Sequence, residues 1–479
     1  MIEKLKKHYT NHKQVFFLII ILIFALFLRV YALGSPAFWI DESISSTASK
    51  MILQKGLPIF DSGAFYSRAL VFHYLQSFCL LFNSTEFNAR FISVIFGLLT
   101  IVLAYFIGKE YSKSGGILSA LFVAIFYLEV FFSRQARFYQ LFQLMFFLSI
   151  YLLYKSKENP KYIYLALIAL VITINTQLAG IVLIPFFIIY MIFFLKQKKY
   201  TYLSIIPLGF LVYKAISVFG MTSNFLPRIT LYINRYFSYA SNMYYLLILF
   251  IPGIIWAFYK KKKLTALILL PSFILLFGVF FIRVFAFRYI YFFVFPLILF
   301  SSLLMSFLYE KYGKIMLISI FFLILLPSNL FFPYTYVNVI SPIKYNYNDF
   351  SAPEINYLTI PSNLSEILKQ DKTIIFTLFS PSIEWHIKKP DYAFPFSMNG
   401  IGKDTISYNN SNNQRVDVYS GAPISTERPN QSFYFILDYF SAIKLKPDQR
   451  EQLQKILENC TISYENKDLQ IYDCPQNYQ

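Results

Sequence analysis

The sequence predicts a polytopic α-helical membrane protein with a small α/β domain at its carboxyl end. One observation behind this fold class is the composition: 57% of the 479 residues are hydrophobic, 14% are charged, and the mean hydropathy of +0.52 exceeds that of ordinary soluble proteins. The other is a change near residue 332, after which membrane-length apolar runs stop and Asn, Ser, Asp and Pro become frequent. We therefore expect a transmembrane domain at 1–332 and an extracytoplasmic domain at 333–479.

Apolar runs recur through the first part of the chain. Runs of about 17 to 21 residues cross a hydrocarbon core about 30 Å thick as helices, which satisfy their own backbone hydrogen bonds in lipid. The sequence predicts about eleven such helices, at 15–33, 91–108, 116–132, 139–154, 162–176, 180–195, 202–218, 243–259, 264–282, 289–309 and 315–332. Short interfacial helices are expected in outer loops, namely one beginning near Asp41 and others at 68–82 and 224–240.

Lysines cluster in alternate loops between these helices. They occupy the segments 4–13, 109–113, 155–161, 196–199, 260–263 and 311–314, which contain no arginine. By the positive-inside rule, these loops and the amino terminus are cytoplasmic, so residues after 332 lie outside a plasma membrane. The net charge of +18 is therefore interpreted as a topology signal, and no nucleic acid partner is expected.

Arginines gather at the opposite side, where orientation does not require them. They are Arg68, Arg90, Arg134, Arg137, Arg228, Arg235, Arg283 and Arg288. Single arginines could contact lipid headgroups or cap helices. A guanidinium is also a planar, permanently charged fork that matches phosphate oxygens. Eight together favour an outward-facing site for an anion.

The outer side of the membrane part offers few groups for acid–base chemistry. Its acids are Asp41, Glu42, Asp61, Glu86 and Glu129, and its histidine is His73, so a general base must come from this set. Alternatives remain for two of them: Asp41 could be a helix N-cap, and Glu129 could form a buried ion pair with Arg134 or Arg137. The acids of the first loop could also bind a divalent metal, but no His/Cys cluster indicates a metal site. We therefore expect no required cofactor.

Three stretches resemble one family. "LRVYALGSPAFWIDESISSTA" from Leu28 resembles the first outer loop of the polyprenyl-phosphate-sugar-dependent glycosyltransferases of the GT-C fold, the superfamily of protein O-mannosyltransferases and lipid A aminoarabinose transferases. "FFSRQARFYQLFQLMFFLSIYLL" from Phe131 resembles its second outer loop, and "FRYIYFFVFPLILFSSL" from Phe287 resembles its late Arg-Tyr helix. The chain departs from the family at Tyr66 to Ala69, where a His-Pro or Pro-Pro pair is common, and at Gln177, where a histidine is common.

The resemblance implies inverting transfer of a sugar from an isoprenoid phosphate to an acceptor hydroxyl on the outer face. It makes Asp41 the expected catalytic base, with Glu42 beside it holding the loop or tuning that acid. The expected donor-phosphate residues are Arg134, Arg137, Arg288 and Tyr289. Further candidates for substrate contact are Arg68, Tyr66, His73, Glu86 and Tyr139. The acceptor (protein, lipid or glycan) stays open, and the alternative function is a transporter or flippase of a lipid-phosphate substrate.

The carboxyl-terminal segment reads as a small α/β domain. "KTIIFTLF" and "SFYFILDYF" predict buried strands, "PDQREQLQKILENC" predicts a helix, and "TISYEN" with "LQIYDC" predicts a terminal strand pair. In an oxidising location, Cys460 and Cys474 at the edges of that pair are expected to form a disulfide, while Cys79 in an apolar segment stays free.

Overall fold

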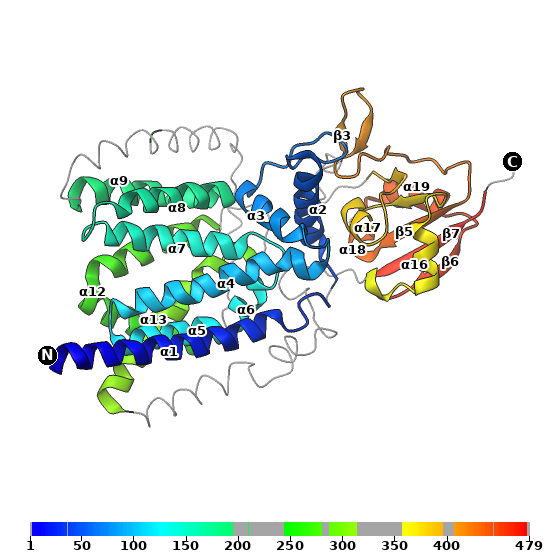
Figure 1. Ribbon diagram of the computed structural model, residues 1–479. Helices are drawn as coiled ribbons and strands as arrows, with labels where there is room; N and C mark the ends of the chain where they lie inside the picture. The colour runs from blue at the N-terminus through cyan, green and yellow to red at the C-terminus, as the bar shows by residue number, and fades with distance from the viewer. Residues whose placement is uncertain are drawn as a thin grey trace. The chain divides into compact units, whose positions relative to one another are not determined.

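The computed structural model of the chain describes residues 2–35, 37–194, 209, 244–279, 287–313, 357–395, 407–443 and 445–476 (Figure 1). Residue contacts divide the chain into two compact units. The helical unit comprises Met1–Leu33 and Arg90–Tyr345, and the mixed unit comprises Gly34–Ala89 and Asn346–Gln479. The domain boundary predicted near 332 lies outside the described residues and stays a prediction. The grouping of residues 34–89, here called the first loop, with the carboxyl-terminal part was not expected from the sequence.

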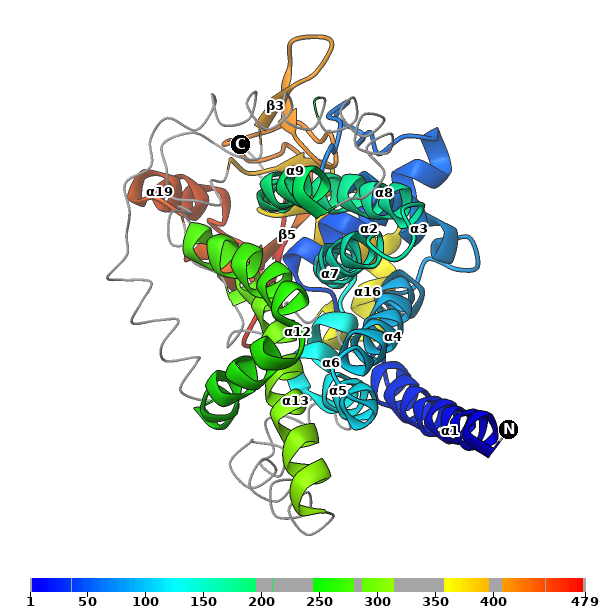
Figure 2. The same ribbon diagram turned by 90° about the vertical axis from the view of Figure 1, so that its left-hand side faces the viewer.

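The helical unit consists of apolar helices packed along their lengths, and Figure 2 shows several of them end-on. Its described helices are α1 (Ile2–Val30), α4 (Glu86–Lys109, whose first turn belongs to the mixed unit), α5 (Lys113–Ile125), α6 (Tyr127–Ser133), α7 (Tyr139–Lys155), α8 (Tyr162–Thr176), α9 (Leu183–Phe194), α12 (Tyr244–Val279) and α13 (Val294–Tyr312), with the 3-10 turns η1 (Leu178–Val182), η2 (Phe287–Tyr289) and η3 (Tyr291–Phe293). α7 packs against α8, α12 against α13, and α5 against both α1 and α13.

Four described helical stretches are long and apolar enough to cross a membrane: 13–30, 86–109, 246–279 and 291–312. α5 and α6, which are bent by 62° relative to each other, together make a fifth candidate. The predicted spans at 162–176 and 180–195 are shorter apolar helices, and those at 202–218 and 315–332 lie outside the described residues, as does the helix predicted at 224–240. The count of about eleven spans therefore stays a prediction.

Two backbone breaks shape these helices. Phe126 is extended (φ −66°, ψ 127°) between α5 and α6, so the span predicted at 116–132 is a bent pair and not one straight helix. Lys261 (φ −141°, ψ 61°) interrupts α12, between the two spans predicted at 243–259 and 264–282. The lysine run at 260–263 thus coincides with a break between two helical arms, as the sequence predicted.

The lysine-bearing helix ends lie together at one end of the helical unit. Hydrogen bonds join α7 to α4 (Lys155 to Glu110, 3.2 Å), α4 to α12 (Tyr111 and Thr265, 3.0 Å) and α5 to α13 (Ser114 to Glu310, 2.5 Å). The described arginines of this unit lie near the other ends of their helices. In the helical unit, the lysines and the arginines are therefore separated in space, as the sequence predicted. Which end of the unit faces the cytoplasm stays a prediction.

Helices α12 and α13 meet at a glycine. A Cβ atom on Gly253 would overlap the backbone carbonyl of Phe300 on α13, so glycine is the residue that permits this approach. On the same helix, a Cβ atom on Gly278 would have nothing within 4 Å. Gly253 therefore lies at a close contact between helices, whereas Gly278 has room for a side chain.

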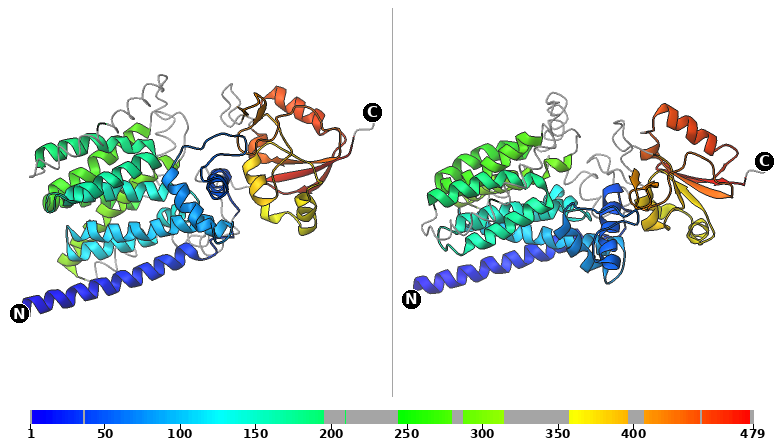
Figure 3. Two further views of the ribbon diagram at one scale, coloured as in Figure 1. Left: turned by 45° about the horizontal axis from the view of Figure 1, so that its top comes forward. Right: turned by 90° about the horizontal axis from the view of Figure 1, so that it is seen from above.

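The mixed unit contains α2 (Ile40–Lys55) and α3 (Leu70–Leu80) from the first loop and a carboxyl-terminal α/β part. The α/β part has η6 (Tyr357–Thr359), α16 (Ser362–Lys369), β1 (Ile375–Thr377), α17 (Ser380–His386), β2 (Tyr392–Ala393), β3 (Ser407–Asn409), β4 (Arg415–Asp417), β5 (Phe433–Asp438), α18 (Tyr439–Ala442), α19 (Pro447–Ile456), β6 (Thr461–Glu465) and β7 (Leu469–Cys474). One sheet has the order β2-β1-β5-β7-β6, and β3 pairs with β4 in a hairpin. Figure 3 shows the helices around the sheet. The strands and the helix predicted from the sequence are confirmed.

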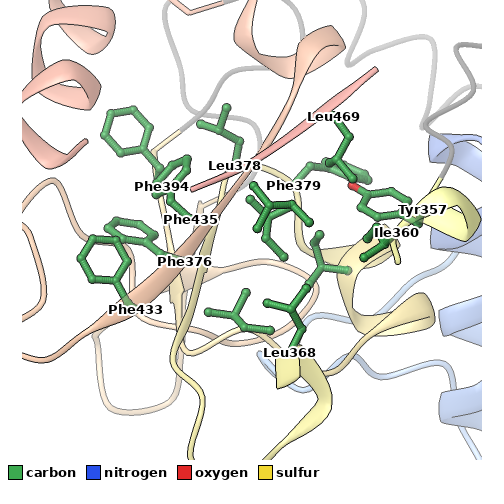
Figure 4. Close-up of a cluster of buried hydrophobic side chains, with 14 of the residues drawn as sticks. Tyr357, Ile360, Leu368, Phe376, Leu378, Phe379, Phe394, Phe433, Phe435 and Leu469 are labelled. Carbon is green, nitrogen blue, oxygen red and sulfur yellow. The ribbon is translucent and has the colours of Figure 1, made fainter. Parts of the chain in front are cut away.

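The strands of the sheet run in mixed directions. β1 is parallel to β2 and β5, whereas β7 is antiparallel to β5 and β6. Aromatic side chains fill the core beside the sheet (Figure 4), where the rings of Phe376 and Phe435 have centroids 5.0 Å apart. Ile44, Ala48 and Met51 of α2 belong to the same buried cluster. The first loop and the carboxyl-terminal part therefore share one hydrophobic core, which accounts for their forming one unit.

The two cysteine predictions are confirmed. Cys460, just before β6, forms a disulfide with Cys474 at the end of β7, and Cys79 on α3 is free and buried. Disulfides persist in oxidising compartments. The bond is consistent with the predicted extracytoplasmic location of this part, which itself stays a prediction.

Candidate active site

Helix α2 places the two adjacent carboxylates of the first loop in different surroundings. The helix begins at Ile40 with Trp39 as its N-cap, so Asp41 is the second helical residue and not the N-cap that the sequence left open. Asp41 is half-buried, whereas the Glu42 side chain is fully buried. A solvated substrate can therefore approach Asp41 but not Glu42, which is a physical distinction that the sequence did not supply.

Glu42 secures the start of α2. The backbone N–H of Trp39 donates to Glu42 Oε2 at 3.4 Å, which is the contact that a glutamate at the third helical position makes in a capping box. The negative charge also lies at the positive end of the helix dipole. This geometry agrees with the expectation that Glu42 holds the loop.

Asp41 belongs to a group of polar residues that includes side chains from the carboxyl-terminal part. Burial raises the pKa of Tyr419, the charges of Asp417 and Asp41 raise it further, and Arg68 lowers it. Tyr66 also raises the pKa of Tyr419. Both tyrosines pack against Phe60, whose ring centroid lies 5.6 Å from that of Tyr66 and 5.2 Å from that of Tyr419. We call Asp41, Tyr66, Arg68, Asp417 and Tyr419 the Tyr419 cluster. Three of its members, Asp41, Tyr66 and Arg68, were predicted site residues.

The carboxyl-terminal part holds this cluster through α17. Ser382 on α17 hydrogen-bonds Ser43 on α2 at 3.1 Å, and Ser380 donates to Asp417 Oδ1 at 2.5 Å. Burial raises the pKa of Asp417, while its hydrogen bonds with Ser380 and Ser420 act in the opposite direction. α17 therefore positions α2 and the segment after β4 at the same time.

Two further acids lie in the same unit. Burial raises the pKa of Asp61, but hydrogen bonds from Lys55 at 2.7 Å and Lys389 at 3.1 Å outweigh it and hold the pKa below its usual value. Burial, followed by the charge of Asp61, raises the pKa of Glu384 to about 7. Within the described residues, Glu384 Oε2 is buried and has no hydrogen-bond partner.

Two predicted substrate residues occupy packing positions. His73 is fully buried, with Nδ1 3.2 Å from Ser49 Oγ, so it joins α3 to α2. Glu86 Oε1 accepts a hydrogen bond from Trp385 at 3.3 Å and lies 3.4 Å from Nδ1 of His386, which ties the first loop to α17. Neither residue is shown to join the Tyr419 cluster, and a substrate role for them stays a prediction.

In the helical unit, Arg134 caps a helix. Its Nη1 donates to the carbonyl oxygens of Leu28, Arg29 and Tyr31 at 3.2, 3.0 and 2.7 Å, at the carboxyl end of α1. Arg90 similarly donates to the carbonyl of Leu33 at 2.9 Å. For Arg134 the structure therefore shows the helix-capping alternative that the sequence left open, whereas Arg90 contacts the turn that follows α1.

Arg137 lies three residues further on, in the turn between α6 and α7. It is buried, its guanidinium carbon is 4.6 Å from the ring centroid of Phe138, and Nη2 is 3.5 Å from the hydroxyl of Tyr139, which is buried as well. Arg288 is half-buried on η2 and lies 5.5 Å from the ring centroid of Tyr289. Both arginines are thus flanked by aromatic rings.

Between the two arginines of that turn lies Gln135, which the sequence analysis did not single out. Its side chain is 2% exposed, and neither its amide nitrogen nor its amide oxygen has a hydrogen-bond partner within the described residues. A buried polar group without a partner costs about 1 to 3 kcal/mol. Only geometry could reveal this residue, because a glutamine in a sequence carries no sign of whether its amide is satisfied.

Glu129 is part of a buried polar network and not of the ion pair that the sequence left open. Its carboxylate accepts from Tyr291 at 2.8 Å and Gln143 at 2.9 Å, and Gln140 lies 2.6 Å from the Tyr291 hydroxyl. No ion pair joins Glu129 to Arg134 in the described part of the chain. The network links α6, α7 and η3, which meet near the Arg137 turn. Within the described residues, no three His, Cys, Asp or Glu side chains are grouped as a metal site.

Comparisons with known proteins identify similar chains. Residues 67–219 match a family model described as dolichyl-phosphate-mannose-protein mannosyltransferase. A search of curated protein sequences finds no match. Among solved structures, ArnT from Cupriavidus metallidurans in the apo state is similar, with a TM-score of 0.60 and 10% identity over 97% of this chain and 98% of that chain.

Two further solved structures are similar at the same level. ArnT from Cupriavidus metallidurans bound to undecaprenyl phosphate has a TM-score of 0.60 and 10% identity, over 96% of this chain and 97% of that chain. The oligosaccharyltransferase of Archaeoglobus fulgidus, in complex with Zn and sulfate, has a TM-score of 0.57 and 12% identity, over 96% of this chain and 73% of that chain. At these identities the likeness shows the fold.

Proposed function

Because the chain has the GT-C fold and is related through residues 67–219 to the protein mannosyltransferase family, we propose that it is an inverting glycosyltransferase. It moves a hexosyl or pentosyl group from a polyprenyl-phosphate donor to an acceptor hydroxyl on the outer face of the plasma membrane. The similar ArnT structure with bound undecaprenyl phosphate supports the choice of donor. The acceptor class, whether protein, lipid or glycan, stays open.

The observation that carries this proposal is the position of Asp41. It lies half-buried in the first turn of α2. The neighbouring Glu42 already accepts a hydrogen bond from the backbone N–H of Trp39 at the start of the helix. A carboxylate in this position can accept the proton of an attacking hydroxyl. We assign Asp41 as the general base for the acceptor hydroxyl.

The reaction requires one bond to form as another breaks. The acceptor oxygen attacks the anomeric carbon, the bond from that carbon to the phosphate oxygen breaks, and the electron pair leaves with the phosphate. Asp41 takes the proton of the acceptor hydroxyl. Attack from the face opposite the phosphate inverts the configuration, and holding both reactants in place lowers the barrier.

The leaving phosphate needs positive charge in a site with little water. We assign this part to Arg137 and Arg288, with Tyr289 and Tyr139 beside them, and add the amide of Gln135, which lacks a partner within the described residues. Arg134 was predicted to share this role. We assign it instead as a positioning residue, because its contacts with the end of α1 support the turn that carries Arg137.

Arg68 and Tyr66 of the Tyr419 cluster are assigned to the acceptor side. Arg68 is exposed and Tyr66 is half-buried, and both share their surroundings with Asp41. This first-loop segment is also where the sequence departs from the family pattern. The carboxyl-terminal part then has a function in this proposal: through Tyr419 and α17 it shapes the surroundings of the base.

The test is turnover of a polyprenyl-phosphate sugar by purified protein, measured as release of polyprenyl phosphate. Asp41→Asn should lower turnover about a hundredfold to ten-thousandfold, the usual effect of removing a general base, while leaving folding and donor binding intact. Asp61→Asn is the matched control, because Asp61 is a first-loop acid held by two lysines. Near-normal turnover in Asp41→Asn would refute the base assignment. Donor that binds and is never cleaved by the unmodified protein would favour a transporter or flippase.

A further inference from the structure

A cavity of about 310 Å³ lies at the lysine end of the helical unit, away from the arginines assigned to the donor. It is lined by Tyr154, Lys157, Glu158, Lys261, Lys262, Lys263 and Leu264. These residues come from the end of α7, from the loop after it and from the break in α12. Its volume is in the range of cavities that hold small ligands. Nothing in the proposed transfer reaction uses it.

The break in α12 brings the lysines to the cavity. On an unbroken helix, successive residues point in directions about 100° apart, so three neighbouring lysines would not face one space. The non-helical backbone of Lys261 (φ −141°, ψ 61°) interrupts that pattern. Lys263 is in addition steadied by the ring of Phe194, whose centroid lies 4.0 Å from its Nζ.

Within the described residues, the positive charge of the cavity is not neutralised by acidic side chains. Lys157, Lys261 and Lys262 form no ion pair within the described residues, and the acid in the lining, Glu158, is bound to Lys155 at 2.5 Å. The stretch 195–243, of which the structure describes only residue 209, contains no Asp or Glu. Four lysines thus converge with one acid that is already occupied, and such a site favours an anion.

An apolar stripe on α12 leads to the same lysines. Ile248, Ile251, Ile255 and Tyr259 recur at helical spacing and are 67, 64, 67 and 86% exposed. From residue 248 to 259 the helix rises about 16 Å, which is close to half of a hydrocarbon core about 30 Å thick. The stripe therefore matches the length of acyl chains in one leaflet, with the lysine cavity at headgroup level.

We propose that this cavity binds the phosphate of an anionic phospholipid whose acyl chains lie along the stripe on α12. Phosphodiester oxygens accept hydrogen bonds from the ammonium groups of Lys157, Lys261 and Lys262. The alternative is that these lysines, like others at this end, only orient the protein in the membrane. That alternative predicts no difference between lysines inside and outside the cavity.

The experiment compares two triple variants of the full-length protein in detergent. One carries Lys157→Gln, Lys261→Gln and Lys262→Gln in the cavity. The control carries Lys113→Gln, Lys161→Gln and Lys311→Gln, which remove the same charge from exposed lysines that do not line the cavity. Binding of phosphatidylglycerol, phosphatidylcholine and inorganic phosphate is measured by native mass spectrometry and by the shift in Tm.

The unmodified protein should retain phosphatidylglycerol in preference to phosphatidylcholine. The cavity variant should bind phosphatidylglycerol about a hundredfold more weakly, as expected for three lysines near an anionic headgroup, while the control variant keeps its affinity. Equal losses in the two variants, or no preference for phosphatidylglycerol, overturn the proposal. Binding of inorganic phosphate without phosphatidylglycerol would assign the cavity to a free anion and overturn the lipid assignment.

Discussion

Replacing Glu384 with glutamine should change how the stability of the mixed unit depends on pH. Glu384 lies on α17, the helix that joins the carboxyl-terminal part to α2, and its Oε2 is buried without a hydrogen-bond partner within the described residues. Burial, with the charge of Asp61, raises the pKa of Glu384 from 4.5 to about 7. The folded protein therefore keeps this proton up to about pH 7, whereas the unfolded chain releases it near 4.5.

The sign of the effect follows from proton binding. Between these two pH values the unfolded state binds fewer protons at Glu384 than the folded state does, so this residue makes stability fall as the pH rises. The difference in pKa corresponds to at most about 3 kcal/mol of stability lost by pH 8, because the partly exposed side chain retains some hydration. Glu384→Gln has no proton to lose and should be spared that loss.

Urea unfolding of the full-length protein in detergent, followed by the fluorescence of the neighbouring Trp385, measures this. The variant should match the unmodified protein at pH 5 and exceed it at pH 8, by up to about 3 kcal/mol. Glu366→Gln, which removes an exposed acid from α16, is the control and should show no such gain. Equal gains at both pH values, or none at pH 8, would refute the reasoning that burial of Glu384 destabilises its charged form.

Two further predictions concern packing and cross-linking. Gly253→Ala should destabilise the helical unit by about 1 to 3 kcal/mol, because the added Cβ overlaps the carbonyl of Phe300, whereas Gly278→Ala should be neutral or slightly stabilising. The melting temperatures of the two variants check this prediction. Equal melting temperatures would contradict the close approach of α12 to α13 at Gly253. Cys460→Ser should destabilise the mixed unit by about 2 to 4 kcal/mol. Alkylation without reduction should label Cys474 in this variant but not in the unmodified protein, where the disulfide protects it. Labelling of both cysteines in the unmodified protein would contradict the disulfide.

The sequence predicted those features that depend on local pattern. Period-two strands, a helix begun by proline, the paired cysteines and the lysine run at the break in α12 are all visible in short windows, and the structure confirms them. The bend at Phe126 was missed because the segment 116–132 is apolar enough to read as one membrane-length helix, and hydrophobicity alone does not show where a backbone leaves the helical conformation.

The candidate site was predictable as residue types but not as partnerships. The family resemblance selected Asp41 over Glu42, but the sequence supplied no physical reason for that choice, since the reason is the burial of Glu42 in the folded protein. It could count Arg134 among the outward arginines, but not foresee that the end of α1 would supply four carbonyl groups to it. Tyr419 and Glu384 were missed because they reach the site only through contacts between segments distant in sequence.

The shared core of the mixed unit sets an order for biosynthesis. The first loop leaves the ribosome before its partner, which is made after all of the intervening segment Arg90–Tyr345. Until β1 and α17 emerge, the faces of Ile44, Ala48 and Met51 that enter this core have no partner to cover them. A chain that stops before residue 357 would carry the helix of Asp41 without its support, exposed to chaperones and proteases. The first loop can thus bury its apolar face only after the carboxyl-terminal part has been made.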